Sequence, residues 1–332
     1  MAGTGYAHLR DADDVLLRVE DLVVEFRARG GTVHAVSGIS LDVREGETLG
    51  IVGESGCGKS TTGRAIMQLP SPTSGRVVFR GTDLTSLSRD ELREVRNHLK
   101  FIFQDPISSL NPRRKMKDIV AEPLTIAGKG TPEERRQRVR EVLEAVGLDP
   151  DANGDKRPHQ FSGGQCQRIS IARALVLDPS LVICDEPVSA LDVSVQAQIL
   201  NLMRDLQDRF GLTFLFISHN LAVVRHMASR IGVMYLGRIV EVSGGHELFA
   251  APKHPYTRML LDAVPDVAMT GKARIPVKGE IPNPITPPSG CPFNPRCPFA
   301  NERCRAEVPP LLEGVACHAV HEGRIEKGLV AA

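Results

Sequence analysis

The sequence predicts an α/β fold in which helices cover a largely parallel sheet. Residues 46–52 form an apolar strand that runs directly into a glycine-rich loop and a helical pattern. Further along, apolar strands at 181–184 and 213–218 enclose a helical pattern at 193–209. Strands and helices in alternation, with apolar strands, are typical of a parallel sheet that is buried on both faces.

Shorter strands precede this core, and a helix follows the glycine-rich loop. Alternating and apolar runs predict strands at 15–19, 22–26, 33–43, 76–80 and 101–103. The helix begins at Lys59 and is expected to end near Leu69, because Pro70 and Pro72 cannot continue it.

The middle and the end of the chain differ in composition from this core. Residues 105–177 are polar and helical, with a clear helix at 132–146, so we expect a helical subdomain inserted at about 105–177. After Pro252 prolines become frequent, and four of the seven cysteines occur there. We therefore predict one domain over residues 13–262 and a small extension over 263–332.

Composition narrows the function. The 332 residues carry a formal net charge of +1, whereas nucleic-acid binders usually present a basic face, so we expect no nucleic-acid partner. No stretch approaches the roughly 20 apolar residues that cross a bilayer. Residues 1–10 lack the basic and apolar segments of a secretory signal. We expect a protein of the cytosol that serves a membrane only through partners.

The glycine-rich loop is the strongest functional signal. It matches the phosphate-binding pattern G-x-x-x-x-G-K-[ST] with Gly53, Glu54, Ser55, Gly56, Cys57, Gly58, Lys59, Ser60 and Thr61. Glycines let the backbone wrap around phosphates, and N–H groups at the following helix start point at the anion. In such a loop Lys59 reaches the β- and γ-phosphates, and the Ser60 hydroxyl binds Mg²⁺. A plain glycine turn is the alternative, but the position between strand and helix favours a nucleotide site.

Two acids end the apolar strand at 181–184. Asp185 is placed to bind Mg²⁺, and Glu186 is placed to polarise the water that attacks the γ-phosphate. Taken alone, acids at a strand end are often solvated or cap a helix. In a chain with a phosphate loop, the catalytic interpretation is favoured.

A second helix start has the features of an anion site. It consists of Ser162, Gly163, Gly164 and Gln165. Ser162 is a good N-cap, and the two glycines leave the helix N-terminus open to an anion. An ordinary glycine-rich helix start is the alternative for this segment in isolation.

These segments together resemble, in order and spacing, the ATP-binding cassette (ABC) family over about residues 15–262. The matching motifs are residues 53–61, Gln104, residues 162–165, 181–187, 189–192 and His219. The resemblance implies a P-loop NTPase core of the ABC type, with a parallel sheet, an antiparallel β subdomain and a helical subdomain. It also implies two cassettes packed head to tail. Residues 162–165 of one cassette, with Asp192, then complete the nucleotide site on the phosphate loop of the other.

The resemblance implies further roles. Gln104 senses Mg²⁺ and the attacking water, and His219 hydrogen-bonds the γ-phosphate. The family usually stacks adenine on an aromatic ring, for which Phe26 is the best candidate, with a core role as the alternative. The chain departs from the family at Cys166 and at residues 156–158, which puts details of the phosphate clamp in doubt but not the chemistry.

Within the family the chain resembles the ATPases of oligopeptide and dipeptide importers. The similar segments are residues 54–58, 103–113, 185–194, 254–257 and 290–297. Residues 109–113 are typical of the second, F-type ATPase subunit, which pairs with a related but distinct ATPase. The resemblance implies ATP and Mg²⁺, two transmembrane permease subunits, an external solute-binding protein and a place at the cytoplasmic face of the membrane. Import of nickel or another small solute, and a non-transport ABC ATPase, are the alternatives.

Four cysteines stand in the predicted extension, spaced C-x5-C-x6-C-x12-C: Cys291, Cys297, Cys304 and Cys317. The cytosol disfavours disulfides, and four thiolates suit zinc or a [4Fe–4S] cluster. The spacing is not that of a zinc ribbon, and tails of similar importers are linked to an iron–sulfur cluster, so we expect a cluster. Zinc and four free thiols are the alternatives. A regulatory metal-binding or redox protein is a different function class that only these cysteines support.

Overall fold

The computed structural model of the chain describes residues 8–10, 13–263 and 279–325, which form two compact units. Unit 1 comprises the described residues within 1–44, 48–86 and 217–332, and unit 2 comprises residues 45–47 and 87–216. Two parts of the predicted extension, residues 264–278 and 326–332, lie outside the described residues. The predicted domain boundaries near 105, 177 and 262 stay predictions.

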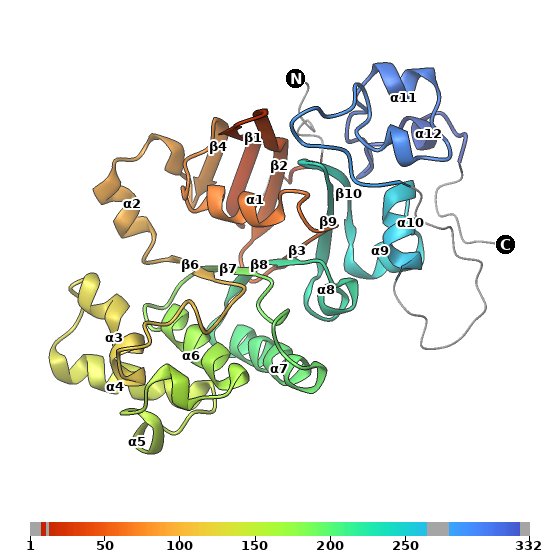
Figure 1. Cartoon of the computed structure of the whole chain (residues 1–332). Helices are drawn as coiled ribbons and strands as arrows, with labels where there is room; N and C mark the ends of the chain where they lie inside the picture. Colours follow the sequence, from red (N-terminus) through yellow and green to blue (C-terminus); the bar gives the residue numbers. More distant parts are fainter. Residues whose placement is uncertain (1–7, 11–12, 264–278, 326–332) are drawn as a thin grey trace. The chain divides into compact units, whose positions relative to one another are not determined.

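Unit 1 contains an antiparallel sheet in the order β2-β1-β4-β5 (Figure 1). Its strands are β1 (Val15–Ala28), β2 (Gly31–Arg44), β4 (Ser74–Phe79) and β5 (Thr82–Asp83). The prediction of two strands at 15–19 and 22–26 is wrong, because β1 is continuous. Its pairing is irregular between Val19 and Leu22, where Asp21 has a φ of 43°. This bulge shifts the alternation of buried residues and so imitates a break in the sequence pattern.

Each unit also contains strands of a second kind of sheet, in the order β10-β9-β3 in unit 1 and β8-β7-β6 in unit 2, with the last two residues of β8 counted in unit 1. The strands are β3 (Thr48–Val52), β6 (Leu99–Ile102), β7 (Leu181–Asp185), β8 (Thr213–Ser218), β9 (Arg230–Tyr235) and β10 (Arg238–Gly244). β3 pairs with β9 in parallel, β6 pairs with β7 in parallel, and β10 runs antiparallel to β9. Strands β3, β7 and β8 are buried along their whole length. The predicted antiparallel β subdomain is confirmed, and the predicted parallel sheet is found as a mixed one, because β10 runs antiparallel to β9.

In unit 1, α1 (Lys59–Ile66) packs against β1 and β2. It ends three residues before the predicted Leu69, because Gln68 adopts a left-handed φ of 57° that a helix cannot contain. The other helices of unit 1 are α8 (Leu221–Met227), α9 (Gly245–Ala250), α10 (Pro255–Asp262), α11 (Glu302–Ala306), α12 (His318–His321) and 3₁₀ turns at Leu84–Ser86 and Asn294–Arg296.

Unit 2 holds most of the longer helices. They are α2 (Arg89–Val95), α3 (Met116–Ile126), α4 (Pro132–Ala145), α5 (Pro150–Asn153), α6 (Gly163–Leu175), α7 (Val193–Phe210) and a 3₁₀ turn at Pro158–Gln160. Helices α3, α4 and α6 pack on one another, and α6 also contacts α7 and β6. Within the described part of the chain, no helix combines the length and the apolar character needed to cross a membrane.

Candidate nucleotide site

The phosphate loop, residues 53–61, connects β3 to α1 and lies tightly against other segments of unit 1. A Cβ atom at Gly53 would lie 2.1 Å from the carbonyl oxygen of Met234, and one at Gly58 would lie 2.2 Å from that of Ala35. Gly58 also has a φ of 105°, which side-chain-bearing residues rarely adopt. Glycine is therefore required at both positions by close approach of the backbone.

Lys59 is the buried cation of this loop. Its Nζ donates hydrogen bonds to the carbonyl oxygens of Gly53 at 2.8 Å and of Glu54 at 2.9 Å. The ammonium is thereby held at the first turn of α1, where the helix N-terminus also favours an anion. An ammonium and a helix start at one place form a site for phosphate groups.

In unit 2, β7 ends in the two predicted acids. Asp185 is buried, and Glu186 follows with a φ of 48°, a left-handed conformation that is unfavourable for a residue with a side chain. Gln104, after β6, donates a hydrogen bond from Nε2 to Oε2 of Glu186 at 3.1 Å. The structure thus brings together two predicted catalytic side chains from the ends of two strands.

The start of α6 has the predicted cap. The Ser162 hydroxyl accepts a hydrogen bond from the Gln165 N–H at 3.3 Å, and the Gln165 side-chain oxygen accepts one from the Ser162 N–H at 2.9 Å. This reciprocal pair is a capping box. A Cβ at Gly164 would lie 2.6 Å from Cγ1 of Val195 in α7, so the second glycine lets α6 approach α7.

Three other predicted nucleotide residues lie at the surface. His219 follows β8 and is exposed, and Asp192 is exposed at the N-cap of α7. The Phe26 side chain in β1 is 40% exposed, which contradicts the alternative of a core role. The parts of these residues in nucleotide binding stay predictions.

Two residues far along the chain hold Glu54 of the phosphate loop, and sequence analysis missed both roles. The Arg296 guanidinium donates two hydrogen bonds to the Glu54 carboxylate, at 2.8 and 3.1 Å. The Tyr256 hydroxyl accepts a hydrogen bond from the Glu54 N–H at 2.8 Å. Arg296 is 242 residues from Glu54 and Tyr256 is 202 residues away, so no local sequence pattern predicts either contact.

An aromatic cluster lies beside this contact. The ring centroids of Tyr235 and Tyr256 are 4.6 Å apart, and Phe293 lies 5.2 and 5.5 Å from them. The Arg296 guanidinium lies over Tyr235 and Phe293. All three rings are almost completely buried, so the C-terminal residues are packed into the core of unit 1.

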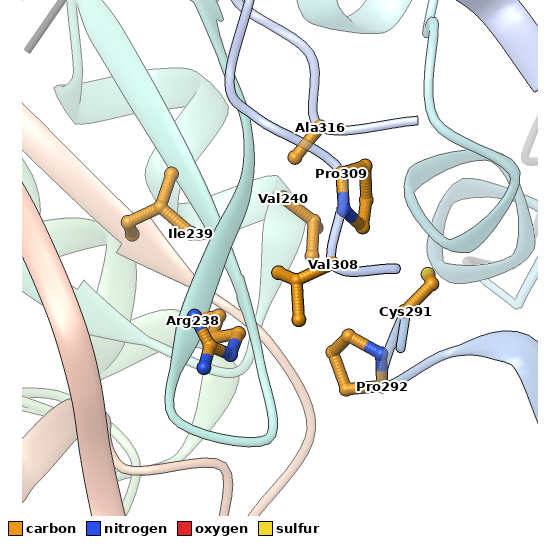
Figure 2. A pocket seen from close by; sticks show the side chains of 8 residues that line it. All are labelled: Arg238, Ile239, Val240, Cys291, Pro292, Val308, Pro309 and Ala316. Carbon is orange, nitrogen blue, oxygen red and sulfur yellow. The ribbon is translucent and has the colours of Figure 1, made fainter. Parts of the chain in front are cut away.

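The same packing continues along β10. Figure 2 shows Val240 of β10 on the same side of the strand as Val308 and Pro309, with the Ile239 side chain on the other side. A small cavity is lined by Arg238, Ile239, Val240, Cys291, Pro292, Val308, Pro309 and Ala316. Its volume of about 10 Å³ is at the lower limit for one water molecule. A larger pocket of about 190 Å³ shares Arg238, Pro292 and Val308 with it.

The four cysteines of the C-terminal part lie in one region. The Cys291 N–H donates to the carbonyl oxygen of Cys304 at 2.8 Å. Burial raises the pKa of Cys291 to about 12, with smaller contributions in the same direction from Cys317, Cys297 and Cys304. Burial also raises the pKa of Cys297 to about 11. Four thiols suit iron or zinc as donors. The described residues nevertheless contain no group of three or more His, Cys, Asp or Glu side chains arranged to hold a metal.

The remaining cysteines are fillers, as expected. Cys57, Cys166 and Cys184 are buried in the phosphate loop, α6 and β7. Burial raises the pKa of each thiol, so all three stay neutral.

Comparison with known proteins identifies the family. Residues 36–189 match the family model described as "ABC transporter", and residues 240–304 match "Oligopeptide/dipeptide transporter, C-terminal region". The oligopeptide transport ATP-binding protein AppF of Bacillus subtilis (strain 168) is 52% identical over 302 residues, which cover 88% of this chain and 92% of AppF. This chain is an ABC transporter ATPase. It belongs to the branch of ATP-binding subunits of oligopeptide transporters.

Other relatives of this ABC ATPase agree. The oligopeptide transport ATP-binding protein OppF of Salmonella typhimurium (strain LT2) is 50% identical over 320 residues, covering 92% of this ATPase and 95% of OppF. The solved dimer of the ATP-binding cassette MJ0796 in a post-hydrolysis state with ADP and Pi has a TM-score of 0.63 at 31% identity. That match covers 69% of this ATPase and 98% of the MJ0796 chain.

The two family matches divide the features of the ATPase between them. The first spans the phosphate loop, Gln104, residues 162–165, Asp185 and Glu186. The second spans Tyr256, Arg296 and three of the four clustered cysteines, and it ends before Cys317.

Proposed function

We propose that this ABC ATPase energises the import of dipeptides or oligopeptides through separate membrane subunits. The match of residues 240–304 to the C-terminal region of oligopeptide/dipeptide transporters carries the proposal. Two transmembrane permease subunits form the pathway, and an external solute-binding protein delivers the solute. The ATPase lies at the cytoplasmic face of the membrane, paired with a second, related but distinct ATPase.

Within the proposed site, the phosphate loop binds the β- and γ-phosphates through backbone N–H groups and Lys59. Ser60, Gln104 and Asp185 hold Mg²⁺, since hydroxyl, amide and carboxylate oxygens are the donors this hard cation prefers. When bound, Mg²⁺ neutralises the charge that develops on the transferred phosphoryl group. Glu186 orients and polarises the attacking water, and its hydrogen bond with Gln104 supports this role.

The proposed phosphate clamp acts on the partner cassette. Residues 162–165 present the N-terminus of α6, which has no acidic residue in its first turn and so favours an anion. Asp192 and His219 complete the nucleotide site, with His219 at the γ-phosphate, and Phe26 stacks on adenine. The dimeric state of the MJ0796 cassette supports an arrangement in which each site needs both chains.

We also propose that Cys291, Cys297, Cys304 and Cys317 bind a [4Fe–4S] cluster. Their gathering in one region, with three of the four buried, supports this, and closing a metal site requires their thiols to turn towards one another. Anaerobically purified protein should then be brown, with about four irons per chain. One zinc per colourless chain would favour the zinc alternative. No metal under chelator-free conditions would indicate four free thiols.

Reconstitution in liposomes tests the transport proposal. The ATPase is assembled with its permease subunits and partner ATPase, and phosphate release is followed as the solute-binding protein is loaded. We expect an oligopeptide or a dipeptide to stimulate hydrolysis. Stimulation by Ni²⁺ alone would favour the nickel importer. Hydrolysis that no membrane subunit affects would indicate a non-transport ABC ATPase.

A further inference from the structure

We propose that Arg296 is a positioning residue for the phosphate loop: it neutralises the Glu54 carboxylate and fixes the place of that side chain. The C-terminal part of the chain is then a component of the ATP site. This inference rests on the proposed role of the phosphate loop in binding ATP.

The contact between Arg296 and Glu54 is largely buried and has a defined geometry. The Arg296 side chain is 3% exposed and the Glu54 side chain 25% exposed. A two-bond contact between guanidinium and carboxylate fixes orientation as well as distance. The hydrogen bonds to Glu54 are the largest cause of the raised pKa of Arg296. Because Tyr256 holds the Glu54 N–H, both the backbone and the side chain of this loop residue are fixed from the C-terminal half of the chain.

The contact between Arg296 and Glu54 affects ATP binding because Glu54 is negatively charged. The Glu54 carbonyl oxygen accepts a hydrogen bond from Lys59, so the residue lies next to the phosphate-binding ammonium. The ATP triphosphate is strongly negative, and an unpaired carboxylate beside its site would repel it. Lys59 and Glu54 cancel each other, and Arg296 leaves the loop with a net positive charge.

A simpler role for Arg296 is to anchor the C-terminal residues without affecting ATP. The two roles predict different changes in ATP affinity when Glu54 is neutralised. An anchor is broken equally by neutralising either partner. Under the charge role, Arg296→Gln exposes ATP to an unpaired carboxylate, whereas Glu54→Gln leaves a cation that attracts ATP and that still lies over the rings of Tyr235 and Phe293.

Calorimetric titration of full-length variants with ATP at constant ionic strength separates these roles, with thermal melting to confirm folding. We expect Arg296→Gln to bind ATP roughly 10- to 150-fold more weakly, the range for losing a hydrogen bond to a charged group. Glu54→Gln should bind at least as tightly as the wild type. The double variant should lie within about twofold of the wild type. Arg305→Gln removes an exposed cation of α11 and should change nothing.

Unchanged affinity in Arg296→Gln would overturn the proposal. So would equal losses in both single variants without recovery in the double variant, which indicate an anchor. If Arg296→Gln does not fold, Glu54→Gln alone still tests the charge role. That role is contradicted if Glu54→Gln binds ATP more weakly than the wild type. Lys59→Ala serves as a separate test of the phosphate loop: if it binds ATP normally, the proposed site is wrong whatever the arginine variants show.

Discussion

At the scale of single residues, the site depends on backbone positions that a side chain makes unfavourable. Glu186 holds its carboxylate next to Gln104 from a left-handed backbone conformation, and such strain persists where the surroundings enforce it. The spacing of the phosphate loop and of the two acids made these residues predictable, because the chemistry itself fixes that spacing. The roles of Arg296 and Tyr256 were not predictable, because only tertiary folding brings them to Glu54.

Glu186→Gln should lower turnover by roughly 10²- to 10⁴-fold while ATP still binds, since an amide cannot act as the base towards water. The measurement is phosphate release by the assembled complex, with the substitution in this chain alone and the partner intact, beside ATP affinity. Asp208→Asn, which neutralises an exposed acid of α7, is the control and should hydrolyse normally. Near-normal turnover in Glu186→Gln would refute its proposed role.

Gly53→Ala should abolish ATP binding, because its Cβ would meet the Met234 carbonyl oxygen at 2.1 Å. Gly81→Ala is a matched variant outside the loop, with a φ of 76° and open space around the added atom. It should cost only about 1–2 kcal/mol of stability for its left-handed conformation and leave ATP affinity unchanged. Equal ATP affinity in the two variants would contradict the close approach of the loop backbone.

At the scale of elements, the sequence predicted buried strands well and irregular ones poorly. Strands β3, β7 and β8 are short and apolar throughout, and packing confirms them. In β1 the buried positions change from Leu17 and Val19 to Leu22 and Val24, and the pattern alone suggests two strands. Pairing with β2 and β4 keeps β1 continuous, and that pairing is not visible in its own sequence.

At the start of α6, the contribution of Ser162 to helix stability can be separated from its proposed contribution to ATP hydrolysis. Ser162→Ala should impair hydrolysis by the complex while the isolated chain still binds ATP, because the phosphate it clamps is bound by the partner. Ser88 heads α2 with the same capping box, so Ser88→Ala should cost a similar ~1 kcal/mol of stability. It should not affect turnover. If both variants hydrolyse ATP equally well in the complex, a clamp in trans is excluded.

Helix α10 makes stability depend on pH. His254 is buried at its N-cap and accepts the Tyr256 N–H at 3.0 Å, and burial lowers the pKa of His254 to about 3. The unfolded histidine takes up a proton near pH 6.5 and the folded one only near pH 3, so acidification favours unfolding across that interval. The loss is on the order of 5 kcal/mol at most.

Urea unfolding at several pH values between about 4 and 7 tests this linkage. His254→Asn keeps a side-chain oxygen that caps the helix but does not titrate, so its free energy of unfolding should fall less steeply towards acid. Parallel curves for the wild type and the variant would show that His254 does not contribute.

At the scale of the whole molecule, the C-terminal residues behave as part of unit 1. Phe293 is buried between Tyr235 and Tyr256, so Phe293→Ala should lower the free energy of unfolding by about 3–5 kcal/mol. Phe103→Ala, at a ring 42% exposed, is the control and should cost much less. Urea unfolding followed by circular dichroism measures both free energies. An unchanged free energy of unfolding in Phe293→Ala would show that the C-terminal residues do not stabilise the core of unit 1.

The long separation between Glu54 and Arg296 also has a consequence for synthesis. A ribosome adding about 5–20 residues per second makes Arg296 roughly 10–50 s after Glu54. During that time the nascent chain carries a complete phosphate-loop sequence, but the Glu54 carboxylate lacks its ion pair with Arg296. A chain that terminates early stays in that condition. Fragments that end before Arg296 would bind ATP weakly, so the phosphate loop reaches its full affinity only after the part of the chain that contains Arg296 has been made.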